Sequence, residues 1–485
     1  MVKGLIQIAI VFILVLGTTV NVLAVPYRGF NYDYWGRSVP TPSAYEPLRS
    51  ISARSISEEL GSFNMPQDLF VDINGDIYLV DTGNSRIVVF DRDLNLLRII
   101  DSFYNEGVQD SFNLPRGIFV TQNLDIYVAD TENMRIVTLD ADGNLLRMNH
   151  GAVLEDIEDD FPFFPLKISV DNAGRQFVIV RGVFEGIMRF DPRGRFTGYF
   201  GTIRVAVSPI DWFWRIVSTR EQRARQVLFI PTEFTGMDID EYGFIFTTNI
   251  GTGAGYQVQR LNPSGTDVLS NFTDFDIVGT HNYPVVGQFA GPSTFVDIVA
   301  RGSGMYTAID SNRGRLYTYD SEGNLLYVFG GTGNIVGMQR VPTALAMLDD
   351  TILVLDQLRG EITFYEPTEF GRLINSAIAL RYIGDEAAAV EMWYRVLELD
   401  ENYRLAHIGI GRSLLAAGYN REAMDYLRRG MDTDYYSVAF RRFRTEVLQS
   451  NINHILTAVL VLALIKPSFW IIKKSRKRWR RHADA

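Results

Sequence analysis

The chain has 485 residues, of which 47% are apolar and 21% charged, an ordinary globular composition with room for more than one domain. It contains no cysteine, which excludes disulfides, thiol catalysis and cysteine-ligated zinc. The formal net charge of −10 argues against nucleic acid as a partner, because a phosphate-binding surface needs a basic balance.

The first 24 residues read as an export signal. Lys3 provides a positive n-region, Gly4 to Leu16 is apolar, and Val22-Leu23-Ala24 offers small residues for cleavage after Ala24. An uncleaved anchor is the alternative, because the apolar stretch from Leu5 to Val25 approaches the length that spans a bilayer. We predict that residues 1–24 are a signal peptide.

Residues 25–57 form an aromatic and proline-rich segment before the first repeat. Its large aromatic side chains are too apolar to remain in water, so we expect an extended segment that packs on the rest of this chain rather than on a partner. The aromatic residues are Tyr27, Phe30, Tyr32, Tyr34 and Trp35. The end of the segment, from Arg49 to Ser57, could provide an outer strand that closes a ring.

Two segments that begin 49 residues apart are internal repeats. Residues 66–90 read PQDLFVDINGDIYLVDTGNSRIVVF and residues 115–139 read PRGIFVTQNLDIYVADTENMRIVTL. Weaker copies begin at Pro165, Pro231, Pro292 and Pro342, and we expect the six prolines to be equivalent. Four short strands per unit of about 50–65 residues predict a mainly β fold, a six-bladed β-propeller over residues 58–366.

The repeats carry a signature between their second and third strands. It reads DTGNSRI from Asp81 to Ile87 and DTENMRI from Asp130 to Ile136, while DSNRGRL from Asp310 to Leu316 keeps the Asp and Arg spacing. These stretches resemble the NHL repeat family, which implies a propeller but no particular activity. We interpret the signature Asp and Arg as structural, because they recur in several units that cannot all line one pocket.

The largest irregularity is an insertion at residues 201–229, between the third and fourth units. It combines clustered aromatic residues with arginines, the residue types enriched at binding hot spots. The alternative is an insertion helix that folds its aromatic side chains back onto the ring. The candidate partner-binding residues are Trp212, Phe213, Trp214, Arg215, Arg220 and Arg223.

The search for catalytic chemistry assigns no catalytic, cofactor-binding or metal-binding residue. The propeller has only His150 and His281, and neither has metal-ligand spacing, unlike the zinc-dependent lyases of this fold. The stretch from Asp72 to Asp76 resembles the start of a calcium loop, but Gly83 stands where that loop needs Glu, so we expect a hairpin turn. G-x-S-x-G and Walker-type loops are absent.

Residues 370–450 switch to a helical pattern. Residues 370–403 and 404–436 align at an offset of 34, which pairs Gly384 with Gly418 and Ala389 with Ala423. This resembles two tetratricopeptide repeats. The resemblance implies a groove that binds protein, and a stiff helical stalk without a ligand is the alternative.

Residues 452–472 form a mostly apolar segment, which we predict to be a transmembrane helix. Lys466 can extend to the headgroups, and Trp470 suits the membrane interface. The basic residues of the tail at 473–485 should remain in the cytoplasm by the positive-inside rule. An amphipathic surface helix with a basic tail is the alternative.

The sequence therefore predicts a cell-membrane protein with extracytoplasmic domains that bind or scaffold other proteins. Export signal, NHL propeller, tetratricopeptide pair and one span together resemble envelope proteins that accompany bacterial sugar importers of the ABC type. That resemblance implies a transporter permease or another envelope protein as the partner. The alternative is an enzyme, a metal-dependent propeller hydrolase of the gluconolactonase and regucalcin kind with a metal on the axis.

Overall fold

The computed structural model describes residues 25–151, 162–201, 233–250, 257–269, 279–281 and 283–483, with side chains to residue 476 in the last helix. The chain divides into two compact units, residues 1–382 and 383–485. The predicted signal peptide lies outside the described residues, as do all but the first residue of the insertion.

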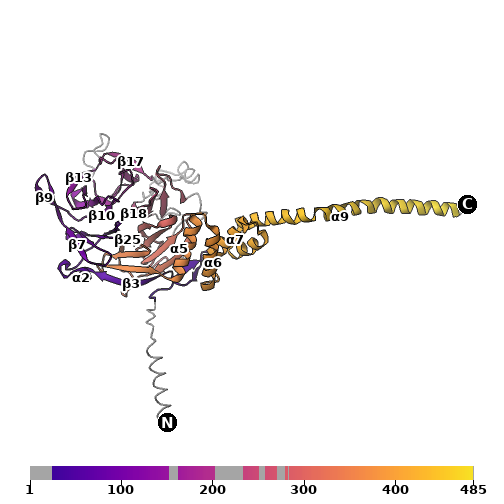
Figure 1. Cartoon of the computed structure of the whole chain (residues 1–485), viewed down its shortest axis with the longest axis horizontal. Coiled ribbons are helices and arrows are strands. Elements are labelled where there is room, and N and C mark those ends of the chain that lie inside the picture. The colour runs from indigo at the N-terminus through magenta and orange to yellow at the C-terminus, as the bar shows by residue number, and fades with distance from the viewer. Residues whose placement is uncertain are drawn as a thin grey trace, which may run out of the picture. The chain divides into compact units, whose positions relative to one another are not determined.

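The first unit is a propeller of six antiparallel sheets, whose first strands contact one another in a closed circle (Figure 1). Blade 1 comprises β4 (Asp68–Val71), β5 (Ile77–Asp81), β6 (Arg86–Phe90) and β7 (Leu96–Ile100), and blade 2 comprises β10 (Gly117–Val120), β11 (Ile126–Asp130), β12 (Arg135–Leu139) and β13 (Leu145–Asn149). Blade 3 comprises β14 (Pro165–Val170), β15 (Gln176–Val180), β16 (Ile187–Phe190) and β17 (Phe196–Phe200), and blade 4 comprises β18 (Phe234–Ile239), β19 (Ile245–Asn249) and β20 (Val258–Leu261). Blade 5 comprises β21 (Phe295–Ala300), β22 (Tyr306–Asp310), β23 (Arg315–Tyr319) and β24 (Leu325–Gly330), and blade 6 comprises β25 (Pro342–Leu348), β26 (Thr351–Asp356), β27 (Glu361–Pro367) and β3 (Tyr45–Ser52). A hairpin of β8 (Ser102–Asn105) and β9 (Val108–Ser111) connects blades 1 and 2.

The hydrophobic core lies between neighbouring blades rather than in one central mass. In β5, Ile77 and Leu79 pack with residues of blade 6, whereas Tyr78 and Val80 pack with residues of blade 2. Successive side chains of a strand point to opposite faces, so a strand held between two blades needs apolar residues at every position. This explains why most of the second strands are nearly continuous apolar runs, in which polar and apolar residues alternate less than in a half-exposed sheet.

The ring is closed by β3, which pairs with the third strand of blade 6 from Tyr45 opposite Pro367 to Ser52 opposite Glu361. The indigo strand therefore lies beside the orange strands in Figure 1. We expected this role for residues 49–57, but the strand begins at Tyr45 and ends at Ser52. Residues Ala53–Ile56 instead form the short helix α2. The propeller thus begins before residue 58.

The segment before β3 packs on this chain, as expected, but only in part. The short strands β1 (Phe30–Tyr32) and β2 (Ser38–Pro40) form a hairpin that extends blade 5 through the pairing of Phe30 with Val328. Tyr27 is buried and donates a 2.8 Å hydrogen bond from its hydroxyl to the Tyr45 carbonyl oxygen. Trp35 stays 67% exposed, so it is not part of the core.

The six prolines are not all equivalent. Pro342 lies opposite Asp356 at the start of β25, but Phe295 takes the matching position opposite Asp310 in blade 5. Pro292 therefore precedes the blade 5 sheet by three residues, and the expectation was wrong for this blade. Pro231 lies outside the described residues. The longer connection before blade 5 shifts the proline while the strand register stays the same.

Where a blade has the signature Asp, this side chain binds the loop that precedes the blade. Asp130 accepts a 2.7 Å hydrogen bond at Oδ1 from the Asn113 backbone N–H and one of 2.7 Å at Oδ2 from Arg135 Nε. Both side chains are buried, so the pair is structural, as the sequence indicated.

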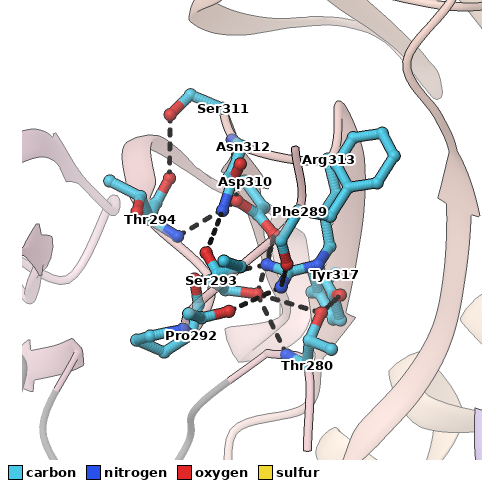
Figure 2. Close-up of polar contacts among 12 residues, drawn as sticks. Thr280, Phe289, Pro292, Ser293, Thr294, Asp310, Ser311, Asn312, Arg313 and Tyr317 are labelled. Atoms are coloured by element: carbon cyan, nitrogen blue, oxygen red, sulfur yellow. Dashed lines mark hydrogen bonds and ion pairs between the residues drawn. The ribbon is translucent and has the colours of Figure 1, made fainter. Parts of the chain in front are cut away.

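In blade 5 the arginine that meets the signature Asp differs from the expected one. Figure 2 shows Asp310 with Ser293 and Thr294 from the preceding loop and with Arg313. Arg313 Nη1 lies 3.3 Å from Asp310 Oδ2. Arg315, which matches the signature in sequence, instead lies over the ring of Phe30. In this blade the signature arginine, Arg315, therefore contacts the β1–β2 hairpin through Phe30.

A helix of the first unit, α5 (Glu369–Tyr382), packs against the propeller through a buried arginine. Arg301 donates hydrogen bonds of 2.6 Å to the Tyr45 hydroxyl and 2.8 Å to the Tyr327 hydroxyl. The Tyr327 hydroxyl in turn donates to Asn375 Oδ1 at 2.7 Å. One guanidinium therefore connects blade 5, the ring-closing strand and α5.

The second unit contains α6 (Glu386–Leu399), α7 (Arg404–Ala416), α8 (Asn420–Arg429) and α9 (Thr433–Ala483). Gly384 and Gly418, 34 residues apart, both end helices with a positive φ, of 86° and 87°. A Cβ on Gly411 would lie 2.6 Å from Leu427 Cγ, so the glycine lets α7 and α8 approach closely. The two segments that align at an offset of 34 residues therefore have a glycine turn at the same position.

The last helix, α9, is long and apolar enough to cross a membrane. Its stretch Thr433–Arg476 contains an 18-residue window of mean hydropathy 2.2, and none of that window is buried. Pro467 lies inside the helix, and Lys474 Nζ lies 4.7 Å above the Trp470 ring. The predicted span at 452–472 falls within this stretch.

Candidate functional site

Charged and small residues alternate around the innermost circle of the propeller. The strand register gives each blade one residue at an equivalent position. In blades 1, 2, 3, 5 and 6 this residue pairs with the next-to-last residue of the second strand. In blade 4 Gly236 takes this position, because its neighbour Met237 pairs with Thr247. From blade 1 to blade 6 these residues are Asp68, Gly117, Lys167, Gly236, Asp297 and Ala344. Alternate blades therefore contribute charge, and the blades between them contribute almost no side chain.

Lys167 joins two of the other blades across the axis. Its Nζ lies 2.6 Å from Asp68 Oδ1 and 3.1 Å from Asp297 Oδ1. Burial by itself lowers the pKa of the Lys167 ammonium, but the charges of Asp297 and Asp68 outweigh burial and hold the pKa above its usual value. Lys167 is therefore a permanent cation at the centre of the ring.

The axial carboxylates also link consecutive blades through backbone N–H groups. Asp68 Oδ2 accepts from Ile118 N at 2.9 Å, and Asp297 Oδ2 accepts from Leu345 N at 2.8 Å. One layer further along the axis, Asp238 Oδ2 accepts from Ala300 N at 2.8 Å. Each carboxylate thus fixes its own blade to the next one in the ring.

A pocket of about 200 Å³ lies on the axis between the six first strands. Lys167 and its two carboxylates form one part of its wall, and Asp238 forms another. Phe70 and Phe119, both half-buried, supply an aromatic wall in which the ring centroids are 5.0 Å apart. The pocket therefore combines an apolar side with a charged side.

Two acidic groups of this pocket, Asp238 and Asp297, have raised pKa values. Burial raises the pKa of Asp238 to about 7, although backbone N–H groups of Ala300 and Ile239 partly oppose it. Burial likewise raises the pKa of Asp297 to about 6, with the charge of Lys167 acting against it and that of Asp68 adding to it. Desolvation dominates in both carboxyl groups.

This arrangement suits binding better than metal chemistry. The ammonium of Lys167 already lies between two of the three axial carboxylates. In the part of the chain that the structure describes, no group of three His, Asp or Glu residues is placed to hold a metal ion. The Asp72 stretch is a hairpin turn, in which Asp72 Oδ1 accepts from the N–H groups of Asn74 and Asp76.

The sequence-predicted site and the axial pocket involve different residues. The candidates in the insertion, Trp212, Phe213, Trp214, Arg215, Arg220 and Arg223, lie outside the described residues. The described flanks of that insertion are β17 and β18. Sequence reasoning missed Asp68, Lys167, Asp238 and Asp297. A signal existed in PLKISV (165–170), where a lysine interrupts a first strand that otherwise resembles its copies.

Comparison with known protein families identifies the first two repeats of the propeller. The NHL repeat matches residues 63–90 and 112–139, so the chain carries NHL repeats in blades 1 and 2. No curated protein sequence matches the chain.

Similar solved structures are distant from this chain. A virginiamycin B lyase from Staphylococcus aureus is 12% identical with a TM-score of 0.42, and the alignment covers 66% of this chain and 98% of the lyase. A streptogramin B lyase is 11% identical with a TM-score of 0.41, covering 67% and 100%. A protein of unknown function from Bacteroides caccae is 10% identical with a TM-score of 0.34, covering 60% and 84%. Likenesses this weak assign no activity.

Replacing Asp238 by Asn is expected to flatten the pH dependence of stability between about pH 4 and pH 7. In this window the native state keeps protons on Asp238 and Asp297 that the unfolded chain has released, since their native pKa values are about 7 and 6. The contribution of these groups to the free energy of unfolding therefore falls as pH rises.

The measurement is the urea midpoint of the full chain in detergent at a series of pH values. Asp142→Asn serves as the matched control, because Asp142 lies exposed in the last turn of blade 2. Equal slopes for wild type and Asp238→Asn would contradict the assignment.

Proposed function

We propose that this protein is a membrane-anchored extracytoplasmic binding protein, whose propeller and helical repeats engage protein partners. The observation that supports this proposal most is the apolar stretch of α9, none of which is buried. A helix with 18 consecutive residues of mean hydropathy 2.2 exposes a large apolar surface in water, and a bilayer covers such a surface. At a rise of about 1.5 Å per residue, α9 is roughly 75 Å long, more than twice a hydrocarbon core of about 30 Å.

The charge pattern at the end of α9 sets the proposed orientation. The run from Lys473 to Arg481 contains seven basic residues and no acidic one. Such a cluster beside a span is retained in the cytoplasm, which places the preceding domains on the other side. The proposed signal peptide at residues 1–24 agrees with this orientation, because it would export the chain that follows.

The helical repeat supports a protein partner. The pairs Gly384 with Gly418 and Ala389 with Ala423 keep an offset of 34, and both alanines are fully buried. We interpret α5 to α8 as two tetratricopeptide-like repeats, a kind of repeat that commonly binds protein segments. A membrane protein of the cell envelope, such as the permease of an ABC sugar importer, is the proposed partner.

The enzymatic alternative needs converging metal ligands on the axis. Asp68 and Asp297 would have to release Lys167 before they could coordinate a metal. The axial geometry therefore supports binding over a metal-dependent hydrolase.

The orientation predicts a protection pattern. Protease added to intact cells or protoplasts should digest the propeller and spare an epitope placed at Ala485. Replacing the basic residues from Lys473 to Arg481 with neutral ones should weaken retention of the C-terminal end inside the cell. Immunoblots for the propeller and the epitope measure both outcomes. A propeller that resists protease until the cells are lysed would refute the proposed export.

The partner proposal predicts that Trp212→Ala with Trp214→Ala weakens capture of a membrane protein partner. Truncating an aromatic hot spot costs about 2 kcal/mol or more of binding free energy. The measurement is co-purification from crosslinked membranes, and Trp35→Ala is the matched control because Trp35 is exposed elsewhere on the first unit.

Circular dichroism of the purified variants separates binding from folding. Unchanged capture by the folded double variant would rule out these tryptophans as the interface. Loss of folding would instead place them in the core, which is the alternative that the sequence left open.

A further inference from the structure

One axial carboxyl group, Asp238, has no ion pair among the described residues. Asp68 and Asp297 are paired directly with Lys167. Asp238 accepts hydrogen bonds from the backbone N–H groups of Ile239 and Ala300, both at 2.8 Å, and the charge of Lys167 acts on it without an ion pair. Its side chain is among the residues that line the pocket, and Asp238 remains partly exposed. Among the described residues, three carboxyl groups and one ammonium therefore surround this space, and negative charge is in excess once Asp238 ionises above its pKa of about 7.

We propose that the axial pocket binds a small organic cation, an ammonium group carried on an apolar body. This proposal does not depend on membrane anchoring or on a protein partner, because all the lining residues belong to the first strands of the propeller.

The aromatic wall suits the apolar body of such a cation. Phe70 and Phe119 come from neighbouring blades, are both half-buried, and their rings meet at 57°. Aromatic faces attract ammonium groups and the methylene groups next to them. Met237 and Met347 line the same pocket and supply adaptable apolar contact.

The size of the pocket limits the ligand class. Its volume of about 200 Å³ lies below the roughly 300–1,000 Å³ of pockets for drug-sized ligands. A peptide or an oligosaccharide would not fit, whereas a simple amine would. Once Asp238 is ionised, an anion would meet an excess of negative charge and is disfavoured.

Lys167 provides an internal precedent for the chemistry. Its ammonium lies 2.6 Å and 3.1 Å from two carboxylates of the same ring. The ring of first strands therefore already accommodates one ammonium group, and Asp238 offers a second position one layer along the axis.

The test is a calorimetric titration of the full chain in detergent at about pH 8, above the Asp238 pKa of about 7, so that this carboxyl group is ionised. Three probes of similar shape are compared: benzylammonium, the neutral benzyl alcohol and the anionic benzoate. Benzylammonium should bind at least about tenfold more tightly than either of the others, equivalent to roughly 1.4 kcal/mol. Asp238→Asn should weaken benzylammonium binding by about tenfold or more. Phe119→Leu, which keeps an apolar side chain but removes the ring, should weaken it several-fold.

Asp142→Asn, at an exposed turn of blade 2, is the control that should leave binding unchanged. Circular dichroism checks that each variant is folded, and Phe119→Leu keeps the test decisive if Asp238→Asn does not fold. Equal binding of benzyl alcohol and benzylammonium would overturn the proposal. Failure of benzylammonium to bind at about 10 mM would also overturn it, without bearing on the protease and capture experiments.

Discussion

The ion pairs of Lys167 connect three strands that are not neighbours in the ring. Removing an ammonium and two carboxylates from water is expensive, and the attraction between them offsets that cost only when the geometry is good. The small residues at the equivalent positions of the blades between them, Gly117, Gly236 and Ala344, leave room for these three side chains to meet. A Cβ on Gly117 would lie 2.6 Å from the Leu166 carbonyl oxygen, and one on Gly236 would lie 2.5 Å from Asp297 Cα. Close packing of the first strands and the charge at their centre thus depend on each other.

The blades were predictable from the sequence because their determinants are local. Alternating strands, tight turns and the Asp81 and Asp130 signatures lie within single units, and self-comparison detects them. The position of Pro292 was not predictable, because the length of a connection changes without changing the strand register. Arg313 pairs with Asp310 while Arg315 lies over Phe30, a residue far earlier in the chain, so the sequence of the blade alone does not show which arginine meets the Asp.

The candidate site was harder to predict because it is assembled from distant units. Lys167 and Asp68 are 99 residues apart, and Asp297 is a further 130 residues along the chain. Only the closed ring brings them together, and a lone lysine in a strand gives no sign of its partners. Sequence reasoning therefore favoured the aromatic and basic residues from Trp212 to Arg223, because they lie close together in the sequence.

The central claim is that Lys167 acts as the fixed cation of the ring. Urea unfolding of the full chain in detergent, comparing Lys167→Met with the triple variant that adds Asp68→Asn and Asp297→Asn, tests it most directly. Lys167→Met should lower the free energy of unfolding by about 3–5 kcal/mol, because it leaves two buried carboxylates without their cation. The triple variant should recover much of that loss, since it removes the unpaired charges. Wild-type stability in Lys167→Met would contradict the account.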